Sequence, residues 1–173
     1  MDEKDSEVVV EYLKRKRLEE YLIENQKYLY RIAFSYVKNT DDAFEIVQNT
    51  IYKSLSSIKL LKDINSLKPW VTRILVNNCF DFLKSNSKII LSDEVFEKTN
   101  DDNKNILDKI VLKKALDKLS PKLKIIIILR FFEDFKIKDI SQILDMKENT
   151  VKTNLYKALK ILKINLGEDL ANV

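Results

Sequence analysis

The segment Asp139–Leu159 has the sequence DISQILDMKENTVKTNLYKAL, in which two helical patterns meet with a break between them. The first is a short apolar face with helical spacing, formed by Ile140, Ile143 and Leu144. The second has spacings of four, four and three, and is formed by Val151, Leu155, Leu159 and Leu162. Asp145-Met-Lys147 interrupts the pattern. A short helix, a sharp turn and a longer helix form a helix-turn-helix, which docks in the major groove of DNA.

The second of these helices carries polar side chains away from its apolar face. They are Thr150, Lys152, Thr153, Asn154 and Lys157. Ammonium groups bind phosphates, whereas hydroxyl and amide groups also bind base edges. Residues 147–163 contain five lysines and one glutamate, a net charge of +4. A lysine-rich helix face is often only solvated, but the short helix and turn before it favour contact with duplex DNA.

The composition predicts an all-α protein without catalytic chemistry of its own. Among 173 residues there are one glycine and two prolines, whereas a sheet-rich fold needs many more turn residues. With no histidine and one cysteine, the chain lacks a glycine-rich phosphate loop, a dinucleotide fingerprint, a histidine-based triad and a Cys/His zinc site. We therefore expect no catalytic residues, no metal and no cofactor, and a role other than that of an enzyme.

The sequence also indicates a compartment. Cys79 has no partner cysteine within the chain, which fits a reducing cytoplasm. No apolar run approaches the ~18 residues of a membrane-spanning helix. Met1–Asp5 is too acidic for the start of a secretory signal. These features predict a soluble, cytoplasmic protein with no membrane insertion.

The first half of the chain predicts three helices that bury a small core. Helical spacing runs from about Val8 to Val37. A second stripe runs from Asp42 to about Ile58, after a cap at Thr40 or Asp41. A loop follows, and a third helix runs from the proline at position 69 to about position 84.

The second half begins with a polar segment that has no helical or strand period. This segment, 85–108, holds three lysines against six acidic residues, a net charge of −3. Beyond it, Ser120-Pro121 marks the start of a helix that runs to about Phe132. Its apolar run Ile125–Leu129 would also suit a buried strand, but the cap and the flanking helices favour a helix. We therefore expect two small helical domains joined by an acidic flexible linker, at residues 1–84, 109–173 and 85–108.

The motifs together resemble the extracytoplasmic-function (ECF) group of RNA polymerase sigma factors. The segment DAFEIVQ at 42–48 is similar to the family's core-binding helix, DAEDLVQ. The segment WVTRILVNNCFDFLK at 70–84 resembles the promoter-melting helix of the family's region 2. The C-terminal pattern, region 4, is matched at Leu116, Leu119, Pro121, Leu129–Glu133, Ile140, Ile143, Leu144 and Thr150–Lys152. The shared order and spacing of these motifs make the resemblance specific.

The resemblance implies an alternative sigma factor, which directs promoter-specific initiation while RNA polymerase supplies the catalysis. It implies binding to the core polymerase through the β′ clamp helices and the β flap, and regulation by an anti-sigma factor. The contact with the clamp helices falls on Asp42, Glu45, Ile46, Gln48 and Asn49. In that surface, Ile46 and Ile51 would form an apolar anchor beside a polar strip. The same residues also fit the solvated face of an ordinary capped helix.

The resemblance also implies two contacts with promoter DNA. The first domain would melt the −10 element and hold its non-template strand through Arg73, Asn77, Lys84 and the loop Lys59–Ser66. The second domain would read the −35 element as duplex through Thr150, Lys152, Thr153, Asn154 and Lys157. Trp70 is a tempting stacking residue, but a tryptophan on an apolar helix is more often part of the core.

Three positions depart from the family pattern. Asp145 stands where the family has a turn glycine, Lys136 where it has a capping Ser or Thr, and Phe44 where it has an acidic residue. A residue with a Cβ tolerates positive φ less well than glycine, so the turn at Asp145 is expected to be strained.

Two other functions fit parts of the pattern. One is a stand-alone helix-turn-helix regulator that binds duplex DNA without polymerase and uses its N-terminal helices as a sensor or a dimerisation module. The other is a helical adaptor whose basic face binds acidic protein surfaces. Transcription with purified core polymerase separates these functions.

Overall fold

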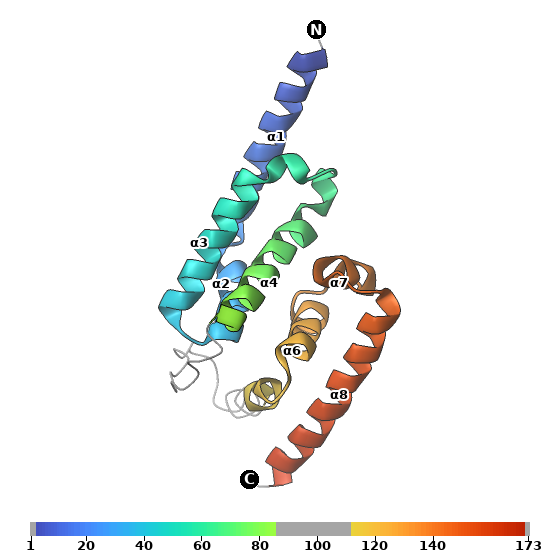
Figure 1. Cartoon of the computed structure of the whole chain (residues 1–173). Coiled ribbons are helices and arrows are strands. Elements are labelled where there is room, and N and C mark those ends of the chain that lie inside the picture. Colours follow the sequence, from blue (N-terminus) through green and yellow to red (C-terminus); the bar gives the residue numbers. More distant parts are fainter. Residues whose placement is uncertain (1–2, 86–111, 172–173) are drawn as a thin grey trace. The chain divides into compact units, whose positions relative to one another are not determined.

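The computed structural model describes residues 3–85 and 112–171, with side chains described for 8–85 and 112–164. Throughout these ranges the regular structure is helical and no β-strand occurs, which confirms the prediction of an all-α fold. The chain forms two compact units, Met1–Glu94 and Val95–Val173 (Figure 1). Most of the predicted linker, 85–108, lies outside the described residues.

The described residues of unit 1 form four α-helices rather than the three predicted. They are α1 (Glu3–Glu24), α2 (Gln26–Val37), α3 (Thr40–Ser56) and α4 (Leu67–Ser85). The predicted first helix is broken at Asn25, which has φ −109° and ψ 16°. The Asn25 side-chain amide donates to the carbonyl of Tyr21 at 2.8 Å, and so binds the last turn of α1. A break of one residue shifts the apolar period too little to be visible in the sequence.

Helix α3 begins one residue after a side-chain cap. The Asn39 side chain accepts a hydrogen bond from the Asp42 backbone N–H at 3.0 Å, so the predicted cap at Thr40 or Asp41 was wrong. Asp41 and Asp42 lie in the first turn, where their negative charges favour the helix dipole.

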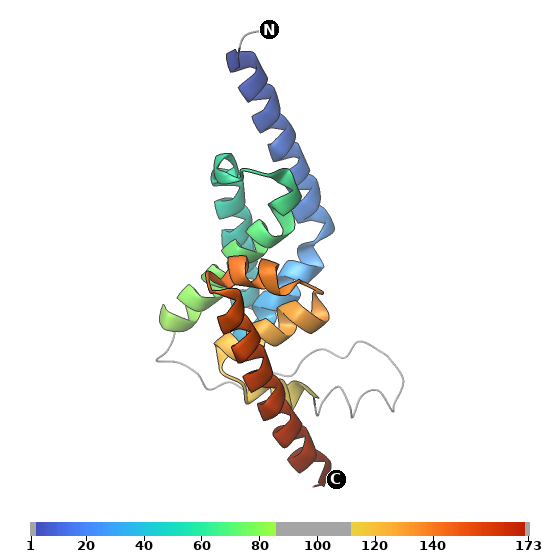
Figure 2. The ribbon, with the colours of Figure 1, turned by 90° about the vertical axis from the view of Figure 1, so that its right-hand side faces the viewer.

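The connection between α3 and α4 is more ordered than the predicted loop. It contains two 3-10 turns, η1 (Ile58–Leu60) and η2 (Ile64–Ser66), with Leu61 in extended conformation after η1. Ile58 and Leu61 are buried. The middle of α1 runs past this connection (Figure 2).

The core of unit 1 is apolar, with polar pairs between helices. Its fully buried large side chains are Leu18, Leu29, Ile32, Ile46, Val71, Leu75 and Val76. The hydroxyl groups of Tyr28 and Thr72 are 2.6 Å apart and join α2 to α4. The Asn78 amide donates to Thr50 Oγ1 at 2.9 Å and joins α4 to α3. Such bonds compensate the cost of burying polar atoms, and they also fix how α4 lies against its neighbours.

Unit 2 contains helical residues 112–117, α6 (Pro121–Ile127), α7 (Ile137–Leu144) and α8 (Glu148–Ala171). Helix α6 continues into a π-helical turn, η3 (Ile128–Phe132), so the apolar run Ile125–Leu129 is helical as predicted. Ser120 occupies the N-cap position without a side-chain hydrogen bond, and Pro121 opens the first turn.

One side of α8 packs on the core of unit 2. A buried cluster is formed by Ala115, Leu119, Leu123, Ile127, Ala158 and Leu162. Val151 is also buried, whereas Leu159 is 37% exposed. The predicted stripe was therefore wrong at Leu159, because residue 158 rather than 159 completes the buried side at seven residues from Val151. The prediction placed Leu159 in the stripe because its side chain is the larger one. It thereby overlooked Ala158, whose small side chain packs closely against α6.

Candidate nucleic-acid interface

The helix-turn-helix geometry is present in unit 2. Helix α7 begins after Lys136, whose backbone N–H donates to Asp139 Oδ2 at 3.3 Å. A lysine side chain has no acceptor, so this is one half of a capping box. Helix α7 ends at Asp145, which has φ 52° and ψ 52°, and the next N–H, that of Met146, donates to the Ser141 carbonyl at 2.9 Å. The predicted left-handed turn at Asp145 is confirmed.

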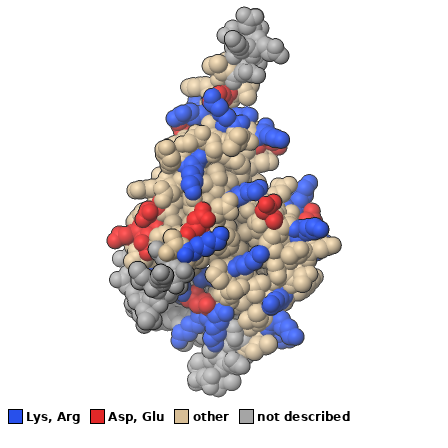
Figure 3. Space-filling view, viewed as in Figure 1, with Lys and Arg blue, Asp and Glu red and all other residues tan. Residues whose placement is uncertain are grey.

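The predicted DNA-reading residues all lie on α8, outside its buried side. Thr150, Lys152, Thr153 and Lys157 are exposed, and Asn154 is half-buried. The Thr153 hydroxyl donates to the Asn149 carbonyl at 2.9 Å, so its oxygen still has a free lone pair. Basic side chains follow the exposed edge of α8 in the space-filling view (Figure 3). The structure therefore brings Thr150, Thr153, Asn154 and Lys157 together on one side of the helix that follows the turn, whereas Lys152 lies on the other flank of its buried side.

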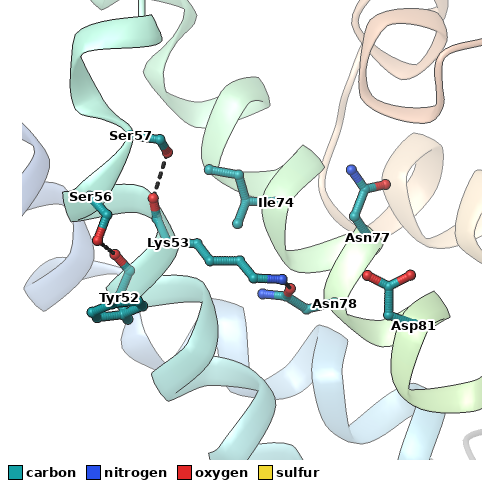
Figure 4. A pocket seen from close by; sticks show the side chains of 8 residues that line it. All are labelled: Tyr52, Lys53, Ser56, Ser57, Ile74, Asn77, Asn78 and Asp81. Atoms are coloured by element: carbon teal, nitrogen blue, oxygen red, sulfur yellow. Dashed lines mark hydrogen bonds between the residues drawn. The ribbon is translucent and has the colours of Figure 1, made fainter. Parts of the chain in front are cut away.

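A pocket of about 460 Å³ lies between α3 and α4 in unit 1. Its lining residues are Tyr52, Lys53, Ser56, Ser57, Ile74, Asn77, Asn78 and Asp81 (Figure 4). The aromatic ring of Tyr52 and the side chain of Ile74 supply apolar surface. The amides, the hydroxyls and the lysine supply hydrogen-bonding groups around it.

Lys53 crosses the pocket from α3 and donates to the side-chain oxygen of Asn78 (Figure 4). The Asn78 amide nitrogen donates to Thr50, and the Thr50 hydroxyl donates to the Ile46 carbonyl at 2.8 Å. This chain of hydrogen bonds fixes the ammonium group of Lys53 in the pocket, which Asn77 and Asp81 also line. The pocket thus combines the positive charge of Lys53 and the negative charge of Asp81 with the amide of Asn77, which both donates and accepts.

The sequence analysis did not predict Lys53 and Asn78 as residues of this site. A signal for Asn78 was available, because it continues the buried stripe of Val71 and Leu75 at helical spacing, and a polar residue there implies a buried hydrogen bond. Lys53 had no such signal. Arg73 and Lys84, also predicted to hold the −10 strand, are exposed on α4 but do not line the pocket. Trp70 is half-buried.

The predicted polymerase-binding strip lies on α3. Glu45, Gln48 and Asn49 are exposed and Asp42 is half-buried. Ile46 is only 2% exposed, so its place in this surface was wrong: its side chain belongs to the core of unit 1. The exposed apolar side chain of the strip is Phe44, which is 52% exposed. Its ring lies 5.0 Å from that of Tyr30 on α2, centroid to centroid.

Nothing in the described part of the chain points to metal or thiol chemistry. No group of three or more potential metal ligands occurs there. Cys79 is buried, and this burial raises the pKa of its thiol to about 12, so the thiol stays protonated at neutral pH. Burial, and to a lesser extent Cys79, raises the pKa of Tyr36. Within the same ranges, no helix has the length and apolar character needed to cross a membrane.

Comparison with known proteins agrees with this geometry. Residues 22–89 match the family described as Sigma-70 region 2, and residues 109–162 match Sigma-70, region 4. The RNA polymerase sigma factor SigV of Bacillus subtilis (strain 168) is 43% identical over 152 residues, which cover 87% of this chain and 92% of the relative. The chain is an ECF sigma factor of RNA polymerase. It is thus an alternative sigma factor that directs transcription initiation, and the stand-alone regulator is not favoured.

More distant relatives show the same architecture. The ECF RNA polymerase sigma factor SigX of B. subtilis is 23% identical, over 78% of this sigma factor and 76% of the relative. RpoE, solved in complex with the anti-sigma factor NepR from Bartonella quintana, superposes with a TM-score of 0.74 at 22% identity, over 86% of this chain and 96% of that one. CnrH, solved with the cytosolic domain of CnrY, has a TM-score of 0.69 at 16% identity, over 93% and 97%. These two structures support the fold.

Proposed function

We propose that three surfaces divide the work of this sigma factor. The strip on α3 binds the β′ clamp helices of the core polymerase. The pocket between α3 and α4, with the connection after α3, holds the non-template strand of the −10 element. The exposed face of α8 reads the −35 element as duplex DNA. The observation that carries the proposal is the pocket itself, which Asn77 lines together with a lysine held by a hydrogen bond to Asn78.

The α3 strip has the make-up of a protein-binding surface. Glu45, Gln48 and Asn49 form a hydrogen-bonding rim, and the half-exposed ring of Phe44 replaces Ile46 as the apolar anchor. Contact with Tyr30 limits the freedom of the Phe44 ring before binding, so less entropy is lost on docking. Aromatic side chains of this kind often carry much of the energy of an interface.

Charge reversal tests the polymerase surface. Glu45→Lys combined with Gln48→Ala is expected to abolish co-purification with core polymerase while the helical circular dichroism persists. Phe44→Ala is expected to weaken binding roughly tenfold. Glu24→Lys, a charge reversal at an exposed glutamate of α1, is the matched control. If the double variant co-purifies as well as this control, the α3 strip is not the polymerase surface.

The pocket suits a base taken out of the stack. Tyr52 and Ile74 offer apolar surface to a flat ring, while Asn77 and Lys53 offer hydrogen bonds to its edge or to a neighbouring phosphate. Arg73 and Lys84, exposed on the same helix, would bind the phosphates of the strand on either side. The amide of Asn77 is thus the residue proposed to sense the base.

Removing that amide tests the pocket. Asn77→Ala is expected to lower open-complex formation by roughly tenfold, because a base edge loses its partners, while binding to core polymerase is unchanged. Permanganate reactivity of unpaired thymines measures opening, and co-purification measures binding. Gln26→Ala, which removes an exposed amide on α2, is the control. An equal loss of opening and of polymerase binding would instead indicate a folding role for Asn77.

The remaining assignments complete the proposal. The α8 face places Lys152 and Lys157 for phosphates and Thr150, Thr153 and Asn154 for phosphates or base edges. We assign the −10 domain to residues 1–84, the linker to 85–108 and the −35 domain to 109–173. The β flap would contact the latter domain, and polymerase would supply the catalysis. By analogy with RpoE, which was solved with the anti-sigma factor NepR, an anti-sigma factor would restrain this protein in the cytoplasm.

A further inference from the structure

The middle of α1 binds the α3–α4 connection through side chains that no motif above includes. The ammonium group of Lys14 donates to the backbone carbonyl of Leu61 at 2.8 Å. One turn earlier, Glu11 Oε1 lies 3.3 Å from the ammonium of Lys59. The helix therefore contacts both the first 3-10 turn and the extended residue that follows it.

The Leu61 carbonyl accepts its hydrogen bond from outside the connection, namely from Lys14 on α1. Local hydrogen bonds close the turns on either side: Leu61 N–H donates to Ile58 at 3.0 Å, and Ser66 N–H donates to Asp63 at 3.0 Å. The extended backbone of Leu61 lies between these turns. Lys14 supplies a charged donor to that backbone, and the bond is partly buried, so water competes with it less than at the surface.

The two contacts differ in strength. The side chains of Lys59 and Glu11 are 74% and 43% exposed, so solvent screens their ion pair and it contributes little. Lys14 is half-buried and its bond is shorter. Lys14 therefore carries most of the restraint.

Apolar packing fixes part of the connection but leaves space on its α1 side. A pocket of about 370 Å³ separates α1 from part of the connection, lined by Val10, Leu13, Lys14, Lys62, Asp63 and Ile64. Without the bond from Lys14, the connection has space in which to shift at this side, although the buried side chains of Ile58 and Leu61 still tether it. The hydrogen bond thus selects one position of the connection.

We propose that Lys14 is a positioning residue, which holds the connection so that the exposed side chains of Lys59 and Lys62 face the non-template strand. The inference rests on the proposed role of this connection in holding the −10 strand. It gives the middle of α1 a function, which is to hold the DNA-binding segment in position.

The test compares three variants of the full chain. Lys14→Met removes the donor but keeps an unbranched side chain, and Lys14→Arg keeps a cationic donor. Lys16→Met removes the same charge from an exposed position of the same helix and is the matched control. Hydrogen–deuterium exchange of residues 58–66 reports the order of the connection in the free protein. Permanganate reactivity with the reconstituted holoenzyme, at equal polymerase occupancy, reports promoter opening.

In Lys14→Met, exchange in the connection is expected to rise roughly tenfold and opening to fall several-fold, with polymerase binding unchanged. Lys14→Arg and Lys16→Met are expected to behave like the unmodified protein. The inference is overturned if Lys14→Met leaves exchange unchanged, or if Lys14→Arg is as defective as Lys14→Met.

A fourth variant separates this inference from the proposed role of the connection. Lys59→Ala combined with Lys62→Ala removes the two cations without touching Lys14. If this variant opens promoters normally, the proposed role of the connection fails, and the inference fails with it. In the other case, the double variant fails to open promoters, whereas Lys14→Met opens them normally although its connection is loosened. That result would refute only the positioning role of Lys14.

Discussion

Single residues carry the departures of this sigma factor from its family pattern. Asp145 adopts φ 52° where the family has glycine, and Lys38 and Asp134 also have positive φ. The left-handed conformation costs a residue with a Cβ about 1–2 kcal/mol. Unit 2 therefore keeps its turn through the Met146–Ser141 hydrogen bond and the packing of α7 and α8, against a local backbone preference.

A pair of substitutions at Asp145 isolates that backbone cost. Asp145→Gly and Asp145→Ala remove the same side-chain interactions but differ in the Cβ. The glycine variant is expected to exceed the alanine variant in free energy of unfolding by about 1 kcal/mol. Urea denaturation followed by circular dichroism measures the difference. Equal stabilities would show that the turn changes its conformation when the aspartate is removed.

At the scale of elements, α8 joins a buried side to a basic exposed side. Val151, Ala158 and Leu162 fix its orientation in unit 2, and this orientation determines that Lys152 and Lys157 are exposed while Asn154 is half-buried. A lysine binds a DNA phosphate whatever the base sequence. The shorter side-chain amide of an asparagine reaches only the base edge directly opposite it, so it can distinguish sequences. The two kinds of side chain should therefore contribute differently to promoter binding.

Substitutions on α8 distinguish these contributions. For the holoenzyme, Lys157→Ala is expected to weaken binding to different promoters about equally and to reduce the salt slope by about one. Asn154→Ala is expected to change the preference among −35 sequences with little change in salt slope. Filter binding over a series of promoters and salt concentrations measures both. The control is Lys122→Ala, at an exposed lysine of α6. A uniform effect of Asn154→Ala would remove it from base recognition.

For the whole molecule, the net charge is modest, but the basic side chains gather in particular regions. The chain carries 31 basic and 27 acidic residues, for a net charge of +4, so general attraction to DNA is weak. Basic side chains lie along α8 and around the region where α1 passes the α3–α4 connection, with acidic ones among them (Figure 3). Such a protein depends on specific contacts with DNA. When a sigma factor is bound to RNA polymerase, the polymerase supplies further DNA contacts.

Dependence on polymerase can be measured directly. The purified chain alone is expected to show no tight, promoter-specific binding to duplex DNA, whereas addition of core polymerase yields run-off transcripts from a subset of a promoter library. Core polymerase alone is the control. Tight binding by the free chain, with transcripts unaffected by its addition, would favour the stand-alone regulator after all.

Much of this architecture was predictable because periodicity and capping are local properties. The apolar spacing predicted α3, α4, α7 and α8, and the order of motifs predicted the family. The break at Asn25 and the capping role of Asn39 were not predicted, because each depends on one hydrogen bond rather than on a repeated pattern. Leu159 and Ile46 were misplaced for a related reason: spacing identifies an apolar face, but not how deeply each member packs.

What the sequence determined by itself was the helical class, the helix-turn-helix and membership of the sigma factors, since these depend on residue types at fixed separations. What only the tertiary structure decided was which groups meet across helices. Lys53 with Asn78, and Lys14 with the Leu61 carbonyl, are separated by 25 and 47 positions in the chain. No local pattern encodes such pairs, because they form only when the apolar core has brought α1, α3 and α4 together.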